Sequence, residues 1–483
     1  MKFAMLGGFG QSGRLHVNRS DTMSRLSRRS FLAGSTALLA APALRVQAED
    51  FDVDVAIVGA GAAGIAAARR LRAAKARFVL FEAESRIGGR CVTDSALFGV
   101  PFDLGAHWLY QPRTNPLMAL APPTGLEVYS APRGEGMRIG PRDARASELE
   151  NFFSQLVSAR HAIDEAGRND DMAAAVALPT DLGKWRATIE FALGPYFSGK
   201  PLADVSARDM VRAASRDRAA FCRQGAGALL AKLAHGLPVQ LKTPVTLLEW
   251  DHHGVNVTTS KGRLRARNVI FTASTNVIAA GRIGFKPALD PRWANAATAL
   301  SLGSLDHIAL ALPGNPLGLL RDDLVFEQAK GPRTAALLAR VSGTDLHLVE
   351  VAGHFGRQLS AQGETAMLEF AREWLASLFG SRVKNAIGQG HATRWNAQPY
   401  VLGAMSAATP GHAAARAILQ DPFGGRIWFA GEAAHESQWG TVAGAWESGE
   451  RVAQAVLKRM ATKPERPARQ KNRRHYRRHR RGG

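Results

Sequence analysis

Cysteine is almost absent from this sequence, which holds only Cys91 and Cys222 among 483 residues. Two cysteines cannot build a disulfide framework or a multi-cysteine metal site, and they can form at most one bridge. The sequence also contains no HExxH and no paired CxxC pattern, which argues against a zinc enzyme. We therefore predict a protein without a metal site, whose two cysteines pack in its interior.

Long apolar runs are also missing. Residues 30–44 form a weakly apolar stretch of about 15 positions, fewer than the roughly 20 that a membrane-spanning helix needs. Arg28 and Arg29 precede this stretch, and a small-residue cleavage pattern ends it at Ala48. This layout predicts a secretory signal of the twin-arginine type over residues 1–48, and hence export to the periplasm. A membrane anchor or a buried helix is the alternative interpretation.

Acidic residues are few: 41 Asp and Glu face 62 Lys and Arg, for a formal charge of +21. Residues 1–48 carry +6 of this and residues 458–483 carry +11, which leaves +4 for the body of the chain. A nucleic-acid function of the folded body therefore has little support. We predict that the tail, 458–483, is disordered, and it could touch an anionic surface through charge alone.

A glycine-rich turn opens the body of the chain. The apolar run Val53–Val58 is typical of a buried parallel strand, and it leads directly into Gly59, Gly61 and Gly64. An alanine-rich amphipathic segment follows, and then a second short strand that ends at Glu82. The order strand, G-x-G-x-x-G, helix, strand and acid is that of a dinucleotide-binding unit.

Each part of this unit has a physical role. The first glycine permits a tight turn, the second lets a phosphate approach the backbone, and the third lets the helix pack against the strand. The helix N-terminus offers free N–H groups to a pyrophosphate, and Glu82 can accept hydrogen bonds from ribose hydroxyls. A purely structural unit of this kind would leave the three spaced glycines without a purpose.

Two further motifs are more specific. EAESRIGGRCVT places Arg86, Gly89 and Arg90 directly after the ribose acid, and DLGAHWLY follows at residues 103–110. Near the other end, residues 427–457 give a strand, then Gly431-Glu432, and then a helix that begins near Thr441. A helix N-terminus stabilises negative charge close to its first N–H groups.

In this order the motifs resemble those of the flavin amine oxidase family. The resemblance covers most of residues 51–457, including the segment 224–250, and is weak over 116–214. It implies bound FAD, which an exported chain must acquire before it leaves the cytoplasm; folding before export is what a twin-arginine signal serves. The cofactor-binding residues that the resemblance implies are Gly59, Gly61, Ala63, Gly64, Glu82, Ala83, Arg86, Gly89, Arg90, Gly105, Ala106, His107, Val245, Trp395, Gly431, Glu432, Thr441 and Val442.

The fold class that follows is α/β. We predict a discontinuous Rossmann-like FAD-binding domain with an α+β substrate domain of the amine oxidase type. The segments predicted for the FAD-binding domain are 51–115, 215–285 and 390–457. The segments predicted for the substrate domain are 116–214 and 286–389.

Three positions depart from the family pattern. Many members carry a lysine that holds a water against the flavin; here the matching position in GSLDHIALAL is His307, our candidate catalytic residue, although it could also be an ordinary strand histidine. The family's aromatic cage is replaced by Met405 and Thr441. The position of a covalent flavin link in some members is Ala404, so FAD should be bound noncovalently. Candidate walls of the substrate pocket are Trp108, Tyr400, Met405 and Trp439.

The resemblance implies an FAD-dependent enzyme that oxidises the C–N bond of a small amine or amino acid to an imine. Its electrons would pass to O2 or to a periplasmic acceptor, and loss of the lysine favours the second. Two alternatives stay open. One is a flavin-dependent C–C desaturase or protoporphyrinogen oxidase, and the other is a redox-silent FAD-binding protein.

Overall fold

The computed structural model describes residues 51–462. The predicted signal, 1–48, and the tail beyond residue 462 lie outside the described residues. The helices of the described part are α1 (Ala62–Ala73), α2 (Pro116–Leu120), α3 (Ala146–Asn169), α4 (Arg186–Phe191), α5 (Ala207–Arg212), α6 (Ala226–Leu233), α7 (Thr275–Ala279), α8 (Pro291–Ala299), α9 (Gly353–Gln362), α10 (Glu364–Phe379), α11 (Val383–Ala386), α12 (Ala415–Ile418) and α13 (Val442–Ala461).

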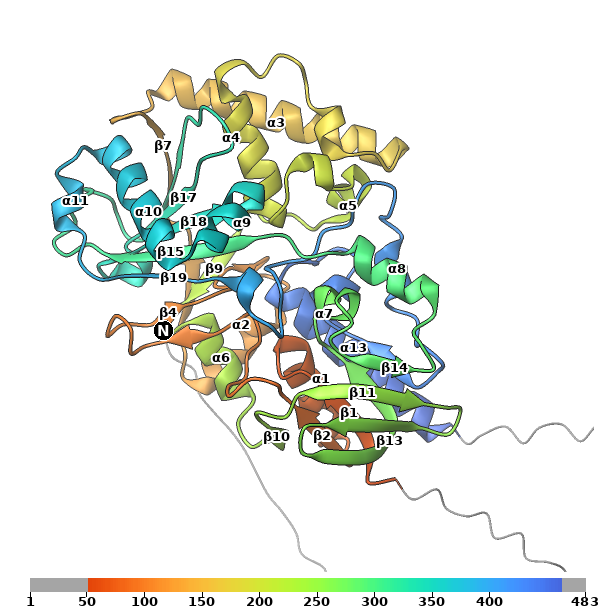
Figure 1. The fold of residues 1–483 in the computed structure, drawn as a ribbon. Coiled ribbons are helices and arrows are strands. Elements are labelled where there is room, and N and C mark those ends of the chain that lie inside the picture. The colour runs from red at the N-terminus through yellow and green to blue at the C-terminus, as the bar shows by residue number, and fades with distance from the viewer. Residues whose placement is uncertain (1–50, 463–483) are drawn as a thin grey trace, which may run out of the picture. The chain divides into compact units, whose positions relative to one another are not determined.

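A first sheet contains the predicted nucleotide-binding unit (Figure 1). Its order is β10-β2-β1-β13-β12-β11-β14, with β20 also paired to β13. The strands β10, β2, β1, β13 and β20 run parallel, and β12 and β11 continue the sheet as an antiparallel meander. The bounds of these strands are β1 (Val53–Val58), β2 (Phe78–Phe81), β10 (Val239–Gln240), β11 (Val245–Trp250), β12 (Val255–Thr259), β13 (Gly262–Phe271), β14 (Gly284–Lys286) and β20 (Ile427–Phe429).

Two helices with small residues, α1 and α13, pack against each other beside this sheet. A Cβ atom on Gly449 of α13 would lie 2.1 Å from the carbonyl oxygen of Ala63 in α1, so only glycine fits there. The third glycine of the turn is equally constrained, because a Cβ on Gly64 would lie 1.9 Å from the carbonyl oxygen of Gly59. The sequence spacing therefore brings the N-terminus of α1 close to β1.

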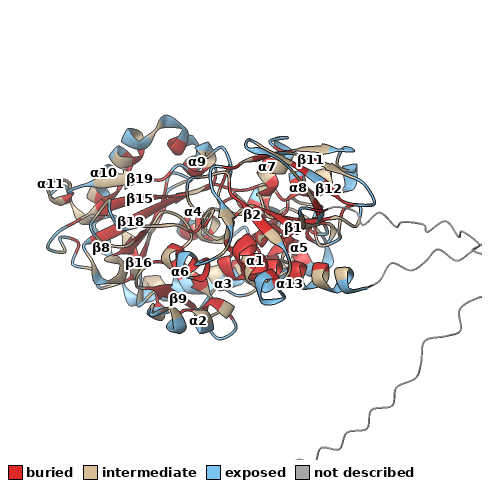
Figure 2. Cartoon of the chain, turned by 90° about the horizontal axis from the view of Figure 1, so that it is seen from below, coloured by how far each residue is buried: buried red, intermediate tan, exposed pale blue. Residues whose placement is uncertain are grey.

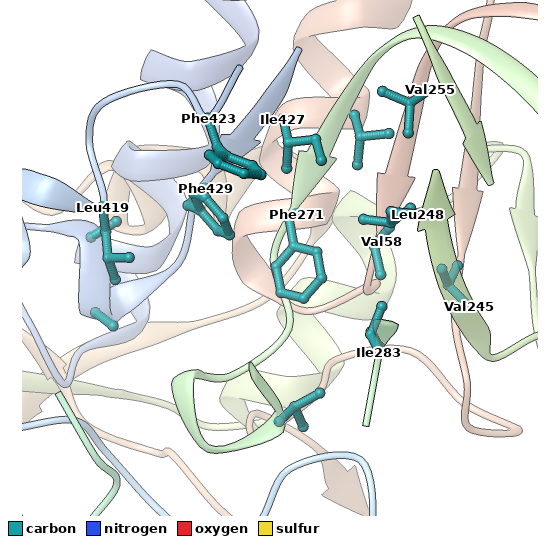
Figure 3. Packing of buried hydrophobic residues seen from close by; sticks show 14 of the residues in the cluster. Val58, Val245, Leu248, Val255, Phe271, Ile283, Leu419, Phe423, Ile427 and Phe429 are labelled. Carbon is teal, nitrogen blue, oxygen red and sulfur yellow. The ribbon is translucent and has the colours of Figure 1, made fainter. Parts of the chain in front are cut away.

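The apolar core on one side of the sheet joins segments far apart in the sequence. Figure 3 shows the rings of Phe271, Phe423 and Phe429 gathered beside β13 and β20. The Phe271 and Phe429 rings have centroids 5.6 Å apart in an edge-to-face arrangement. Burial of these rings contributes strongly to the stability of the fold, and it holds strand β20 against β13.

A second sheet is formed mainly by the middle of the chain. Its order is β19-β15-β18-β17-β16-β7-β8, antiparallel except for the pair β16 and β7. Helix α10 buries Met367, Phe370 and Trp374 in the core of this sheet, and Figure 2 shows β15 and β18 largely buried. The bounds are β7 (Gly134–Ile139), β8 (Arg142–Asp143), β15 (Leu305–Ala311), β16 (Asp323–Glu327), β17 (Ala336–Ala339), β18 (Leu346–Ala352) and β19 (Gly390–Ala392).

Smaller sheets connect these parts. Strand β9 lies between β5 and β6, and β3 pairs with β4. The bounds are β3 (Thr93–Asp94), β4 (Phe102–Asp103), β5 (Leu109–Tyr110), β6 (Val128–Ala131) and β9 (Ala219–Cys222). Both cysteines are buried and free, as predicted from their default packing role. Among residues 51–462, no helix has the length and apolar character needed to cross a membrane.

Three segment boundaries differ from the sequence-based prediction. The predicted FAD-binding segment 390–457 includes β19, yet this strand pairs with β15 and buries Ala392 in the core of the second sheet. The predicted substrate segment 116–214 includes β6, yet this strand pairs with β9, which lies in the predicted FAD-binding segment 215–285. Residues 458–461 are the last turn of α13, because Met460 still packs against the core around α1 and α13, and so they are not part of a disordered tail.

Candidate active site

A cavity of about 520 Å³ extends from the glycine-rich turn to the second sheet. It collects side chains from segments across most of the described chain. Of the predicted cofactor residues, all but Gly64 line it; Gly64 acts one step away, by letting α1 pack on β1. The predicted residues that line it are Gly59, Gly61, Ala63, Glu82, Ala83, Arg86, Gly89, Arg90, Gly105, Ala106, His107, Val245, Trp395, Gly431, Glu432, Thr441 and Val442, together with His307, Trp108, Tyr400 and Met405.

At one end of the cavity, two glycine-containing segments of the backbone lie against each other. Gly61 pairs with Gly88 as in a parallel sheet, and a Cβ on Gly89 would lie 3.3 Å from the Cα of Gly61. Gly61 is also the N-cap of α1, and it provides no side chain to satisfy the first N–H groups of that helix. An uncapped N-terminus with no acid in its first turn is suited to bind a pyrophosphate.

Glu82 lies at the end of β2 and is buried in the same wall. Its Oε2 accepts a hydrogen bond from the Ala60 N–H (2.8 Å) and its Oε1 from the Glu84 N–H (2.9 Å). Burial raises the pKa of Glu82, and these backbone bonds oppose the rise. Each carboxylate oxygen has a second lone pair for a ribose hydroxyl, which is the role that the sequence predicted.

A second helix N-terminus faces the middle of the cavity. Thr441 caps α13, and its hydroxyl accepts a hydrogen bond from the Gly444 N–H (2.9 Å). Glu432 beside it is buried and ion-paired with Arg90 (2.8 Å). Burial alone would raise the pKa of Glu432, but the charge of Arg90 and a hydrogen bond from Ser406 hold it below its usual value. Glu432 is therefore an anion that the surrounding network keeps in place.

These features fit FAD. Two helix N-termini, a close backbone approach and a buried acid after β2 match the pyrophosphate, ring and ribose of a dinucleotide. Ala404 lines the cavity without a nucleophilic side chain, and the thiol of Cys91 donates to the carbonyl oxygen of Ala106 (3.4 Å). The lining therefore agrees with noncovalent binding.

The other end of the cavity contains a buried charged pair. The Nε2 atom of His307, on β15, lies 3.2 Å from Oε1 of Glu350 on β18, and its Nδ1 lies 3.1 Å from the carbonyl oxygen of Asp103. The hydroxyl of Tyr196 donates to the other oxygen of Glu350 (3.0 Å). Since β15 and β18 pair with His307 opposite Glu350, the sheet register fixes this contact.

The pKa shifts of the pair agree with an imidazolium and a carboxylate. Burial lowers the pKa of His307, but the hydrogen bond and charge of Glu350 outweigh it, and the net pKa is raised. Burial raises the pKa of Glu350, but the hydrogen bond from His307 and nearby positive charge make the net pKa lower than usual. The candidate catalytic residue is thus held by a carboxylate that favours its protonated form.

His107 lies beside this pair and differs from it. Neither ring nitrogen of His107 has a hydrogen-bond partner among the described residues, although the side chain is buried. Burial lowers its pKa to about 4, so the ring is neutral near pH 7. A neutral imidazole offers one donor and one acceptor, and no described residue uses either of them in His107.

The same three residues also have the composition of a metal site. Ligand atoms of His107, His307 and Glu350 lie within 4.8 Å of one another, which makes them a group in residues 51–462 able to hold a metal ion. No local sequence pattern indicates that these three residues form a group, because they come from three separate segments. The pairing of His307 with Glu350 accounts for two of the three side chains without an ion.

The remaining wall is aromatic and basic. Trp108 stacks on Tyr110 with ring centroids 5.9 Å apart, and both line the cavity with Arg216. The prediction that Trp439 lines the substrate pocket is wrong. That ring is fully buried, because its Nε1 donates to the carbonyl oxygen of Asp209 (3.3 Å) and its faces pack against Arg216 and Arg416.

Several site residues were missed in the sequence. They are Leu305, Glu350, Tyr110, Tyr196 and Arg216. Tyrosine is rare in this chain, with five in total, and three of them line the cavity. This scarcity is a signal that could have drawn attention to Tyr110 and Tyr196. Tyr196 also ends a π-helical turn, Ala192–Tyr196, an irregularity that is common at functional sites.

Comparison with known proteins defines the class of this protein. The family model described as "Flavin containing amine oxidoreductase" matches residues 144–457, and "NAD(P)-binding Rossmann-like domain" matches residues 57–121. The chain therefore belongs to the flavin containing amine oxidoreductase family, as the motifs predicted. FAD is its cofactor.

Particular relatives lie within that class. Lysine-specific histone demethylase 2 of Homo sapiens is 26% identical over 446 residues, covering 83% of this chain and 53% of the relative. Polyamine oxidase 4 of Oryza sativa subsp. japonica is 24% identical, covering 84% of this chain and 89% of the relative. The chain spans about half the length of the demethylases that it matches.

Solved structures show the same fold. Cyclohexylamine oxidase from Brevibacterium oxydans IH-35A has a TM-score of 0.72 at 22% identity, covering 85% of this chain and 99% of that one. Putrescine oxidase bound to putrescine has a TM-score of 0.72 at 20% identity, covering 84% and 99%. At this identity the likeness concerns the fold.

Proposed function

We propose that this protein oxidises the C–N bond of a small amine or amino acid to an imine. The observation that carries the proposal is a cavity that joins a dinucleotide-binding turn to an end with a neutral histidine and a buried ion pair. Membership of the flavin containing amine oxidoreductase family supports it.

FAD, when bound, supplies the acceptor for the hydride equivalent that leaves the carbon beside the amine nitrogen. The chain's own residues do the rest. A neutral His107 can accept a hydrogen bond from the amine and hold its nitrogen in place. Trp108 and Leu305 provide apolar walls that exclude water from the same space.

His307 and Glu350 act together as a fixed charge pair. Glu350 and the carbonyl oxygen of Asp103 hold the imidazole ring from both nitrogens, so its orientation is set before substrate enters. His307 replaces the family's lysine, and its position is tied to a carboxylate instead of being held on a flexible stem. We propose that reaction with O2 is slow for this reason, and that a periplasmic carrier is the electron acceptor.

The test is an anaerobic absorbance titration of the purified holoenzyme with a panel of amines and amino acids, followed by admission of air. Loss of the oxidised flavin band with one class of amine is the expected result, and slow recovery in air supports the separate acceptor. An intact band with every compound would contradict the proposed reaction. Recovery within seconds would contradict slow reaction with O2.

The Glu350→Gln variant should lose stability in a defined pH window. The pKa of Glu350 is lowered from 4.5, so its contribution is present above pH 4.5 and is lost as pH falls through the lowered pKa. The pKa of His307 is raised from 6.5, so its contribution is present below pH 6.5 and is lost as pH rises through the raised pKa. The difference from wild type in the free energy of unfolding should therefore be largest between these values.

Urea unfolding of both proteins at pH 5.5 and at pH 9 measures this difference. A difference that is equal at the two pH values would show that the pair is not ionised. An exposed pair provides the control: Glu249→Gln removes a partner of Lys286 at the surface, where an ion pair contributes about 0–1 kcal/mol.

We also propose export to the periplasm by the twin-arginine pathway. The support is the sequence around Arg28 and Arg29, which lies outside the described residues. In cell fractionation, replacement of both arginines by lysine should leave the flavoprotein in the cytoplasm. Unchanged periplasmic enzyme would contradict the proposal.

A further inference from the structure

Arg216 is a cation in the cavity wall that no acid neutralises. It lies between α5 and β9, and no described carboxylate reaches ion-pair distance of its guanidinium group. Its Nη1 donates to the carbonyl oxygen of Phe197 (2.5 Å) and its Nη2 to that of Trp439 (2.7 Å). Loss of water around it lowers its pKa, yet an arginine remains charged.

Two other arginines of this region are each paired with an acid, as buried charges usually are. Arg416 is fully buried and forms a bidentate pair with Asp209, with both N–O distances at 2.7 Å. Arg90, in the cofactor wall, pairs with Glu432 at 2.8 Å. A desolvated charge is costly unless it is paired, so the missing partner of Arg216 is a feature to explain.

The free donors of Arg216 are not isolated. Arginine has five N–H donors, and the two hydrogen bonds to backbone carbonyls leave three. The Tyr110 ring lies 5.4 Å from the guanidinium carbon, and its hydroxyl has no acceptor among the described residues. Both side chains line the cavity. Two donors, one of them charged, thus share one part of the wall.

We propose that Arg216 and Tyr110 form a subsite for a carboxylate of the substrate, so that the amine oxidised is that of an amino acid. This inference rests on the proposed amine oxidation and names its substrate class. A guanidinium fork matches the two oxygens of a carboxylate, and the tyrosine hydroxyl adds a third donor. His107 lines the same cavity, and neither of its ring nitrogens has a partner among the described residues.

The same charge excludes another class of substrate. A diamine would bring a second ammonium group into a low-dielectric cavity next to Arg216, where like charges repel strongly. The wall position that the family's aromatic cage would occupy is instead Met405, and Arg216 lies next to it, since a Cβ on Gly440 would meet both side chains at 3.1 and 3.4 Å. We therefore expect discrimination against diamines.

The test compares each amino acid with the amine that lacks only its carboxylate. Suitable pairs are phenylalanine with phenethylamine, leucine with 3-methylbutylamine, and lysine with pentane-1,5-diamine. For wild-type holoenzyme, kcat/KM should favour the amino acid of at least one pair by about 30-fold or more, the range for a desolvated charge pair. In Arg216→Met this preference should fall to near unity, and Tyr110→Phe should reduce it by a smaller factor.

A binding measurement separates this inference from turnover. Benzoate, added to oxidised holoenzyme, should perturb the flavin absorbance of wild type, and Arg216→Met should weaken that binding by about 30-fold. Arg263→Met provides the control, because Arg263 is an exposed arginine outside the cavity. The Arg216→Lys variant keeps a cation and serves if the methionine variant does not fold.

Each outcome decides one question. Flavin reduction by diamines and not by amino acids would overturn the subsite while preserving amine oxidation. Benzoate binding without reduction by any amine would support the subsite and contradict the proposed reaction. A shifted flavin midpoint potential in Arg216→Met, with unchanged benzoate affinity and unchanged discrimination, would show that Arg216 balances the charge of the flavin instead, and would overturn the inference.

Discussion

Replacement of Asp209 by asparagine is expected to lower the free energy of unfolding by about 3–5 kcal/mol, the usual effect of removing one partner of a buried ion pair. Asp209 is fully buried, and both of its carboxylate oxygens accept hydrogen bonds from Arg416 at 2.7 Å. Asparagine has a similar shape but no charge. The guanidinium of Arg416 would then be left in the interior without its counter-ion.

The same substitution should weaken FAD binding, although Asp209 does not line the cavity. Arg416 also donates to the hydroxyl of Ser406 (3.0 Å), and that hydroxyl donates to Glu432 (2.6 Å) in the cofactor wall. Loss of Asp209 thus loosens a chain of contacts that ends on a cavity residue. Urea unfolding and the flavin content of the purified protein measure the two effects.

An ion pair whose acid is exposed gives the control. Asp143 pairs with Arg138 at 2.6 Å, but the aspartate side chain is 81% exposed. Asp143→Asn should change the free energy of unfolding by no more than about 1 kcal/mol and leave the flavin content unaltered. Equal effects of the two substitutions would show that burial of the Asp209–Arg416 pair has no special importance.

Replacement of Gly449 by alanine is expected to expel FAD as well as destabilise the fold. The new Cβ would lie 2.1 Å from the carbonyl oxygen of Ala63, a backbone atom that cannot rotate away. Helix α13 must move from α1, and overpacking of this kind typically costs about 1–3 kcal/mol. Because the N-termini of both helices face the cavity, the shift displaces two cofactor-binding ends at once.

The gain in helix propensity works in the opposite direction. Alanine in place of an interior helical glycine would by itself stabilise the helix by about 0.5–1 kcal/mol. A net loss of stability therefore isolates the steric clash. Gly331→Ala is the control, since a Cβ there meets no atom within 4 Å. An unchanged flavin content in Gly449→Ala would contradict the role given to the contact between α1 and α13.

The nucleotide-binding half of the fold was largely predictable from the sequence. Val53–Val58 is a strand with the predicted bounds, and the predicted second strand is Phe78–Phe81, directly before Glu82. These elements carry their signals within a few neighbouring residues: an apolar run, a glycine turn or a helical period. The order of motifs at both ends then indicated the flavin family and most residues of the cofactor wall.

The substrate end could not be predicted in the same way. Glu350 belongs to a uniformly buried strand, and nothing near it in the sequence distinguishes it from a structural acid. It gains its role because strand pairing places it opposite His307. Trp439 shows the converse, since proximity to the cofactor motif suggested a pocket wall, while packing against two arginines drew the ring into the core.

The sequence by itself thus determined the cofactor class, the position of the cofactor turn and the presence of His307 at the end of the site. Tertiary structure alone decided which side chains meet His307 and that the guanidinium of Arg216 binds backbone carbonyls without an acid partner. The physical reason is the separation along the chain of the residues that interact. Turns, caps and strand periodicity depend on neighbours along the chain, whereas the charge environment of Arg216 depends on Phe197, Trp439 and Tyr110, which only the packed fold brings together.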